Sequence, residues 1–182
     1  MGLDPKGRPS VSPQTAQGRP TEGAPGAADF ISIIPAATDA KADTLVICCS
    51  SARFQPHFRD FLANGLKLSQ YDLLAVPGGV QWLALPDILP KHNKVARWTT
   101  EFLVRRHALR RVVCIAHEDC SAYTDNAALA SLSRLATGRT IREHQLDQLR
   151  KVGANLAEWF AIAPELYFLS IRDTAVVFQK IT

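Results

Sequence analysis

The sequence has little of what marks a secreted, membrane-spanning or nucleic-acid-binding protein. No run approaches the roughly 18 unbroken apolar residues of a membrane span, and the N-terminus lacks the basic-then-apolar order of a signal peptide. Only four cysteines are present, and without a secretory leader they do not predict a disulfide framework. No basic stripe interleaved with aromatic residues favours RNA or DNA. We therefore expect a cytoplasmic protein that binds neither membranes nor nucleic acid.

The excess of positive charge is small and local. The formal net charge is +4, and much of it comes from four arginines that lie close together, Arg105, Arg106, Arg110 and Arg111. Cations complement the dipole at the C-terminus of a helix, so this group indicates the end of a helix more than a phosphate-binding patch.

The chain divides into a proline-rich N-terminal tail and one domain. Residues 1–28 hold five of the eleven prolines and show no apolar periodicity, so they predict a disordered tail. Residues 29–43 predict a linker or docking arm, because Phe30–Ile34 is a short apolar patch. The remainder, residues 44–182, is long enough for a single domain with a substantial core.

From Thr44 onward, short β-branched apolar runs alternate with segments that carry apolar residues at helical spacing. This alternation predicts an α/β fold with a mostly parallel central sheet flanked by helices, and the tight turn Arg172–Thr174 predicts an antiparallel C-terminal edge. The expected strands are 44–48, 71–76, 111–116, 166–171 and 175–181. The expected helices are 54–66, 141–160 and 95–109, the last with Val95, Trp98, Phe102 and Leu109 on one face.

Three candidate site elements follow the first three predicted strands. Cys49 follows the first strand, the Pro77–Gly79 turn follows the second, and His117 follows the third. Ligands of parallel sheets gather at the carboxyl ends of the strands, so these elements should converge on one edge. Cys120 lies three residues after His117 and can join the set. Two cysteines and one histidine with an open fourth position suit a catalytic zinc site, so we predict that Cys49, His117 and Cys120 bind Zn²⁺.

Three segments of the domain point to a known family. Cys49–Arg53 reads CSSAR, Val113–Cys120 reads VCIAHEDC, and Thr100–Phe102 reads TEF. They resemble, respectively, the C-x-D-x-R motif, the strand followed by H-x-x-C, and the Ser-x-Glu-aromatic stretch of the β-class carbonic anhydrases. The resemblance covers about residues 44–182.

The resemblance implies a Cys₂His zinc site, a four-stranded parallel sheet extended at its edge, and a homodimer whose active sites lie near the subunit interface. It also implies reversible hydration of carbon dioxide to bicarbonate by zinc-bound hydroxide, since zinc lowers the pKa of its bound water to about 7. Ser51 and Arg53 take the positions of the family's catalytic aspartate and its arginine partner. Serine brings no charge, so Arg53 would need Glu118 or Asp119 as its carboxylate.

Two other functions stay open at this point. The loss of the aspartate at Ser51 favours a non-catalytic zinc-binding domain of the same fold. Tyr71–Gly79 (YDLLAVPGG) resembles the strand and turn of DJ-1/PfpI-type cysteine enzymes, although Cys120 lacks the glycines of a nucleophile elbow. Cys48 and Cys114 lie within apolar strands, where a free cysteine is usually an inert core thiol.

Overall fold

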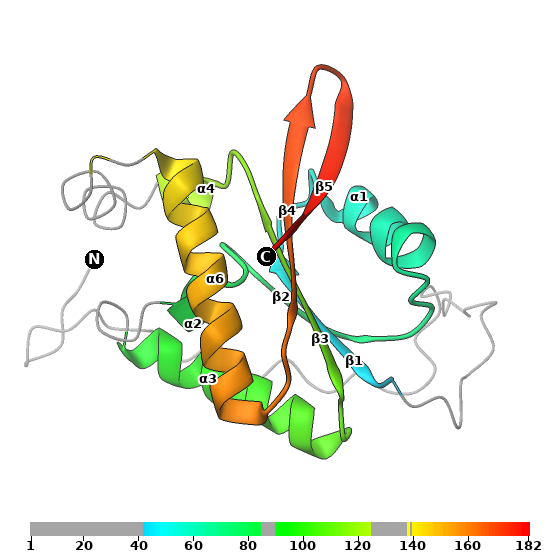
Figure 1. Cartoon of the computed structure of the whole chain (residues 1–182), viewed down its shortest axis with the longest axis vertical. Coiled ribbons are helices and arrows are strands. Elements are labelled where there is room, and N and C mark those ends of the chain that lie inside the picture. Colours follow the sequence, from blue (N-terminus) through cyan, green and yellow to red (C-terminus); the bar gives the residue numbers. More distant parts are fainter. Residues whose placement is uncertain (1–41, 85–89, 125–137, 139) are drawn as a thin grey trace, which may run out of the picture. The chain divides into compact units, whose positions relative to one another are not determined.

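A parallel sheet extended by one antiparallel strand forms the centre of the fold (Figure 1). The computed structural model describes residues 42–84, 90–124, 138 and 140–182. The strand order is β2-β1-β3-β4-β5, with β5 antiparallel to β4 and every other neighbouring pair parallel. The predicted fold class, with its antiparallel C-terminal edge, is therefore confirmed. The strands are β1 (Thr44–Cys49), β2 (Asp72–Val76), β3 (Arg111–His117), β4 (Glu165–Arg172) and β5 (Ala175–Ile181).

The predicted tail over residues 1–28 lies outside the described residues, as does the predicted linker or docking arm up to residue 41. The residue before β1 is bound to the residues before and at the start of β3. The carbonyl oxygen of Asp43 accepts hydrogen bonds from the backbone N–H groups of Arg110 and Arg111 at 2.8 and 3.1 Å. Among the described residues, none of the helices combines the length and the apolar character needed to cross a bilayer.

Helices lie on both sides of the sheet in Figure 1, with α1 on the side opposite α6. The helix predicted over residues 54–66 is present as α1 followed by a π-helical turn, η1, and it ends where predicted. The two short helices α2 and α4 were not predicted, because four residues are too few to show an apolar period. The helices are α1 (Gln55–Asp60), η1 (Phe61–Gly65), α2 (Gln81–Ala84), α3 (Pro90–Arg106), α4 (Ser121–Thr124) and α6 (Ile141–Phe160).

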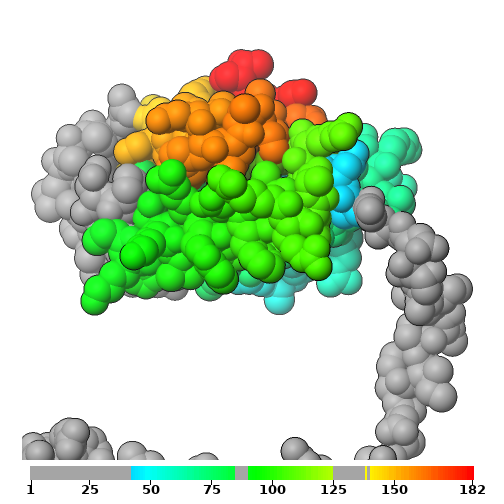
Figure 2. All heavy atoms as spheres, turned by 90° about the horizontal axis from the view of Figure 1, so that it is seen from below, coloured from blue at the N-terminus to red at the C-terminus, as the bar shows by residue number. Residues whose placement is uncertain are grey.

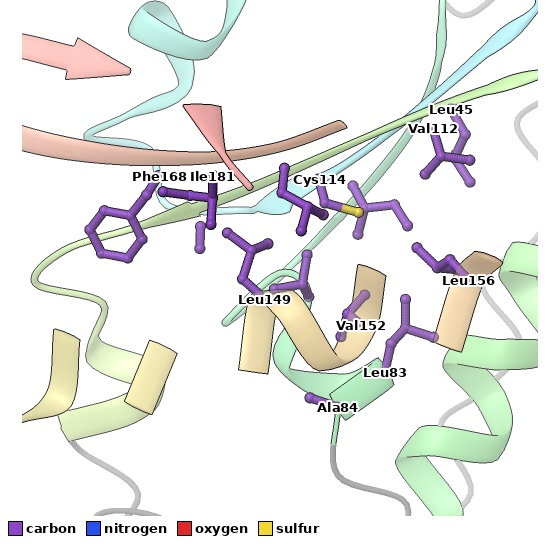
Figure 3. Packing of buried hydrophobic residues seen from close by; sticks show 14 of the residues in the cluster. Leu45, Leu83, Ala84, Val112, Cys114, Leu149, Val152, Leu156, Phe168 and Ile181 are labelled. Atoms are coloured by element: carbon purple, nitrogen blue, oxygen red, sulfur yellow. The ribbon is translucent and has the colours of Figure 1, made fainter. Parts of the chain in front are cut away.

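The core has two layers because successive side chains of each central strand point to opposite faces. In β3, Val112 and Cys114 join the layer under α6, whereas Val113 and Ile115 join the layer under α1. Figure 3 shows the first layer, where α6 presents its buried apolar stripe to the sheet. A capping box at Thr140 satisfies the first N–H groups of α6 and sets the start of that helix.

The helix α3 buries a different face from the one that its apolar stripe suggested. Val95, Trp98 and Phe102 are 63%, 65% and 50% exposed, whereas Thr100 and Val104 lie in the interior. Figure 2 shows α3 lying along the surface of the molecule. The sequence therefore predicted a helix here, but it spans Pro90–Arg106 rather than residues 95–109. Leu109 is buried beyond its end, and the other three residues of the stripe form an apolar face on the outside.

Candidate metal centre

The structure brings together the three residues that the sequence proposed as metal ligands. Cys49 ends β1, His117 ends β3, and Cys120 lies just before α4. The two Sγ atoms and a ring nitrogen of His117 all lie within 4.8 Å of one another, and the Sγ atoms are 3.9 Å apart. All three side chains are buried, with at most 5% of their surface exposed. Two thiols and one imidazole at this spacing are a donor set for a soft or borderline cation.

Backbone packing at the β2 turn fixes the position of Cys49. The backbone N–H of Gly79 donates to the carbonyl oxygen of Val76 at 2.8 Å, which closes the turn after β2. Gly79 has a φ of +54°, and a Cβ atom there would lie 2.9 Å from the carbonyl carbon of Cys48 and from the backbone nitrogen of Cys49. Only glycine combines this backbone conformation with so close an approach. The turn is therefore packed directly against the end of β1.

The ring of His117 is oriented for metal binding through one nitrogen. Its Nδ1 atom lies 2.7 Å from the carbonyl oxygen of Glu118, which can only accept, so Nδ1 carries the hydrogen. The other nitrogen, Nε2, is buried and has no hydrogen-bond partner among the described residues. The ring of Phe54 lies 4.5 Å from the imidazole ring, centroid to centroid, and limits its rotation. A buried acceptor without a donor is costly unless something binds it, so the residues present fit a metal ion.

The two thiols of the cluster differ in acidity from the two core thiols. The pKa of Cys49 is lowered to about 4, first by the hydrogen bond from Cys120, against the effect of burial, and then by the side chain of His117 and the backbone N–H groups of Ser51 and Gly78. The same sulfur contact and burial raise the pKa of Cys120, so in the metal-free pair Cys49 is the thiolate and Cys120 donates. Burial raises the pKa of both core thiols, Cys48 and Cys114, to about 12.

Cys114 is therefore not a plausible nucleophile. Its side chain is fully buried inside β3 and its thiol stays protonated at neutral pH. A cysteine enzyme of the DJ-1/PfpI type needs an accessible thiolate. Burial therefore excludes Cys114 as the nucleophile of that alternative, and Cys120, which lacks the glycines of an elbow, is buried as well.

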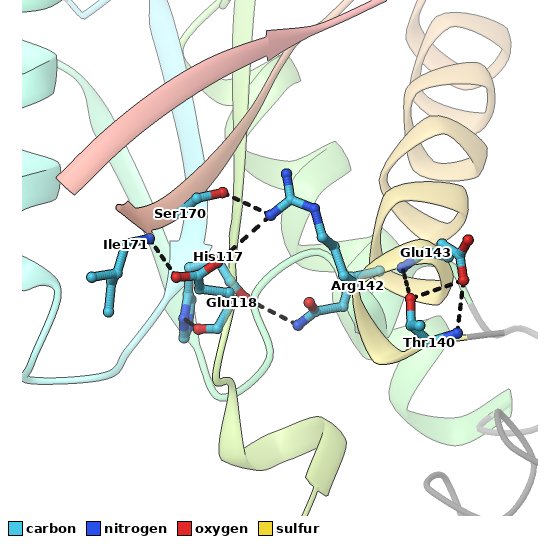
Figure 4. A network of polar contacts seen from close by, with 8 residues as sticks. His117, Glu118, Thr140, Arg142, Glu143, Ser170 and Ile171 are labelled. Carbon is cyan, nitrogen blue, oxygen red and sulfur yellow. Dashed lines mark hydrogen bonds and ion pairs between the residues drawn. The ribbon is translucent and has the colours of Figure 1, made fainter. Parts of the chain in front are cut away.

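A polar network that the sequence did not reveal holds the chain segment after His117 (Figure 4). The side chain of Glu118 accepts a hydrogen bond from the backbone N–H of Ile171, and its second oxygen lies 3.6 Å from Nη1 of Arg142. The same Nη1 donates to Oγ of Ser170 at 2.7 Å. The side chain of Gln145 donates to the carbonyl oxygen of His117 itself at 3.0 Å. These contacts tie the end of β3 to α6 and to the end of β4.

The two residues proposed from the sequence as catalytic lie beside the cluster in different ways. Ser51 lines a pocket of about 230 Å³, and Cys49, His117 and Cys120 line it as well. Arg53 does not line the pocket, but its Nη1 atom lies 3.8 Å from a carboxylate oxygen of Asp119, which does. Of the two carboxylates expected as partners for Arg53, the structure places Asp119 next to it. The carboxylate of the other, Glu118, instead accepts a hydrogen bond from the backbone N–H of Ile171 in β4.

Comparisons with known proteins give fold-level similarity only. No protein-family profile and no curated protein matches the sequence. The structure is similar to that of the carbonic anhydrase from Streptococcus mutans, with a TM-score of 0.48 and 15% identity, over 78% of this chain and 82% of that one. It is also similar to isoform I of the β-carbonic anhydrase from Trichomonas vaginalis, with a TM-score of 0.46 and 11% identity, over 81% and 87% of the two chains. For the β-carbonic anhydrase CafA of Aspergillus fumigatus the TM-score is 0.44 and the identity 15%, over 76% of each chain.

Proposed function

We propose that this chain is a cytoplasmic zinc-dependent carbonic anhydrase, which catalyses the reversible hydration of carbon dioxide to bicarbonate. The observation that carries the proposal is the buried Nε2 atom of His117, left without a hydrogen-bond partner among the described residues in a cluster with two thiols. The H-x-x-C and C-x-x-x-R segments that resemble the β-class enzymes support the choice of reaction.

The side chains of Cys49 and Cys120 and the Nε2 atom of His117 would hold the ion. When bound, zinc lowers the pKa of a water molecule from 15.7 to about 7 and so supplies hydroxide at neutral pH. The chain itself contributes the donors, since Nδ1 of His117 is committed to the carbonyl oxygen of Glu118 and only Nε2 is left to bind. No carboxylate among the described residues joins the cluster, so an ion held by these three donors would keep a position for water.

The pocket beside the cluster suits a substrate of only a few atoms. Its volume is about 230 Å³, and small side chains line much of it, namely Ser50, Ser51, Gly78, Ser121 and Ala122. In the hydration, the oxygen of water bonds to the carbon of carbon dioxide and one C–O π pair moves onto a substrate oxygen. The proton of the water passes to solvent, which balances the reaction as carbon dioxide and water giving bicarbonate and a proton.

We further propose that the active form is a homodimer. The exposed apolar face of α3, made by Val95, Trp98 and Phe102, supports this, because solvent-exposed aromatic side chains at helical spacing are typical of contact surfaces. Glu101 and Arg105, which lie beside the same face, form an ion pair with each other at 2.9 Å, so neither charge of the pair is left uncompensated there. A two-fold interface pairs a surface with itself, so this apolar face can pack on the same face of a second copy.

A stopped-flow assay of carbon dioxide hydration on metal-quantified protein tests the proposed activity. We expect the rate to follow the zinc content: it should fall after chelation, return when zinc is added, and be absent in His117→Ala. The alternative, a non-catalytic zinc-binding domain, is favoured by the uncharged Ser51. Fully zinc-loaded protein that does not accelerate hydration would establish this alternative and overturn the proposal.

A further inference from the structure

The two sulfur atoms of the cluster lie close to each other at the edge of a pocket. The Sγ atoms of Cys49 and Cys120 are 3.9 Å apart, although the residues are 71 positions apart in the sequence. The backbone N–H of Gly78 is hydrogen-bonded to both of them. Both cysteines line the pocket of about 230 Å³, so a small reagent can reach the sulfur atoms although the side chains are buried.

The backbone holds the two cysteines with different firmness. Cys49 ends β1, and the close approach of Gly79 to its backbone nitrogen fixes it in the sheet. Cys120 lies outside any helix or strand, between β3 and the four-residue helix α4. A disulfide has an S–S distance of about 2.05 Å, so the sulfur atoms must approach by about 2 Å to form one. A shift of the segment that carries Cys120 supplies this movement and leaves the sheet unchanged.

The other two cysteines are placed where they cannot form such a pair. Cys48 belongs to the core layer under α1 and Cys114 to the layer under α6, so the sheet lies between them. Consecutive side chains of a strand point to opposite faces, so Cys48 also points away from Cys49. Neither core cysteine is among the described residues that line the pocket. The structure therefore offers one pair of thiols for oxidation.

We propose that hydrogen peroxide joins Cys49 and Cys120 in a reversible disulfide, so that this centre holds either a metal ion or a disulfide. The sulfur of a free cysteine binds metal as the thiolate, and a disulfide has no thiolate to offer. Oxidation therefore expels the metal, and bound metal opposes oxidation. This role goes beyond the proposed reaction and does not depend on it, since it needs only the pair of sulfur atoms and a metal that they bind.

The oxidation balances with one hydrogen peroxide for each pair of thiols. One sulfur atom attacks an oxygen of the peroxide, the O–O bond breaks, and the hydroxide that leaves takes up the thiol proton to give water and a sulfenic acid. The second sulfur atom then attacks the first, the S–O bond breaks, and a second water leaves with the proton of the second thiol. The two thiols lose two electrons, and the peroxide is reduced to two water molecules. A partner sulfur at 3.9 Å captures the sulfenic acid before it is oxidised further.

The first test follows zinc and thiols together in the zinc-loaded protein. Hydrogen peroxide is added in the presence of a chromogenic zinc indicator, and samples are alkylated in denaturant at intervals. We expect one zinc to be released for each disulfide, two of the four thiols to be lost, and a non-reducing peptide map to join Cys49 to Cys120. A phosphine reductant with added zinc should restore four thiols and the bound metal.

Cys48→Ala is the matched control for this test, because Cys48 is as deeply buried beside Cys49 but points into the core. It should release zinc and form the same bond as wild type does. Cys120→Ser should form no disulfide within the chain. Four thiols that persist in wild type, a sulfinic acid in place of the bond, or a bond that includes Cys48 or Cys114 overturns the proposal.

The second test measures the coupling between zinc and the disulfide at equilibrium. Mixtures of reduced and oxidised glutathione set the potential, and alkylation gives the fraction of disulfide with and without zinc. Free zinc at about 100 times its dissociation constant should lower the equilibrium constant for disulfide formation about 100-fold, which raises the reduction potential of the pair by about 60 mV. A potential that does not change with zinc overturns the proposal. A protein that hydrates no carbon dioxide would refute the proposed function and leave both tests unaffected.

Discussion

The Nδ1 atom of His117 donates to the carbonyl oxygen of Glu118 at 2.7 Å, and the side chain of that same Glu118 is fixed by β4 and α6. One residue therefore sets both the tautomer of the imidazole and the path of the chain around it. Partners of this kind raise the basicity of a metal-binding histidine and hold its ring in place. The three donor side chains are therefore positioned by contacts well beyond the cluster itself.

We predict about one tightly bound zinc per chain, because two thiolates and one imidazole suit Zn²⁺ better than harder cations. Cys49→Ser, His117→Ala and Cys120→Ser should each lose most of the metal. Cys48→Ala is the control, since Cys48 is equally buried beside Cys49 but belongs to the core under α1. Elemental analysis after dialysis gives the result. A folded wild-type protein without metal, or a ligand variant that keeps its zinc, would contradict the site.

Glu118→Ala should weaken zinc binding by about 10–100-fold, because it frees the segment that carries the hydrogen-bond acceptor of His117. Glu118→Gln should lose less, since the amide oxygen can still accept from the N–H of Ile171. Competition with a chromogenic chelator gives the affinities. Glu158→Ala, at an exposed position on α6, serves as the control and should bind zinc as wild type does. Equal affinities in all four proteins would show that the network does not act on the metal centre.

The sheet could be predicted from the sequence because its signals are local. The β-branched runs at 44–48 and 111–116 identify central strands, and the strand-end rule then brings Cys49 and His117 to one edge. The outward face of α3 could not be predicted, because Val95, Trp98 and Phe102 have the same spacing whether they pack on a core or on a second molecule.

The contacts that hold the three donor residues in place could not be predicted from the sequence either. The packing of Phe54 on His117 joins residues 63 positions apart, and the bond from Glu118 to Ile171 joins residues 53 positions apart. Neither pair has a local motif, since each contact forms only when segments far apart in the sequence pack against each other. The pairing of Arg53 with Asp119 was one of two options that charge alone allowed, and the structure distinguishes them because Ile171 and Arg142 hold the carboxylate of Glu118.

Gly79→Ala should destabilise the protein by about 2–4 kcal/mol, because the new Cβ atom would meet the backbone of Cys48 and Cys49 at 2.9 Å in a strained conformation. Gly138→Ala separates the two causes. Gly138 also has a positive φ of +60°, but a Cβ there would have no atom within 4 Å, so only the backbone strain of about 1 kcal/mol remains. Urea unfolding of both variants gives the free energies. Equal losses would mean that the close approach to β1 is not tight.

The proposed dimer predicts that a charge on the outer face of α3 separates the subunits. Trp98→Glu and Phe102→Glu should each lower the mass in solution from that of a dimer to that of a monomer, because a carboxylate would be buried without a partner. Ala157→Glu places the same charge on an exposed position of α6 and should leave the mass unchanged. Light scattering coupled to gel filtration gives the masses. A monomeric wild type, or dimeric variants, would rule out this face as the interface.

The last prediction concerns Glu165, which joins three strands at the end of the sheet away from the cluster. Its carboxylate accepts hydrogen bonds from Nε of Arg111 at 2.6 Å and from the hydroxyl of Tyr167 at 2.9 Å, and Nζ of Lys180 lies 3.6 Å away. Burial acts to raise the pKa of Glu165, but these donors and charges outweigh it and hold the pKa below its ordinary value of 4.5. The ionised form is therefore favoured in the folded protein.

A folded-state pKa below the ordinary value adds stability that is complete above about pH 4.5 and disappears as the pH falls through the folded-state pKa. Glu165→Gln removes this contribution and should lower the free energy of unfolding by about 1 kcal/mol at pH 7. The difference from wild type should shrink as the pH falls below 4.5, because the unfolded chain takes up the proton first and the folded carboxylate only at a lower pH. Urea unfolding at pH 7, 5 and 3.5 measures it, with the exposed Glu158→Gln as control. A difference that stays constant over this range would show that the carboxylate stabilises the sheet only by its shape and not by its charge.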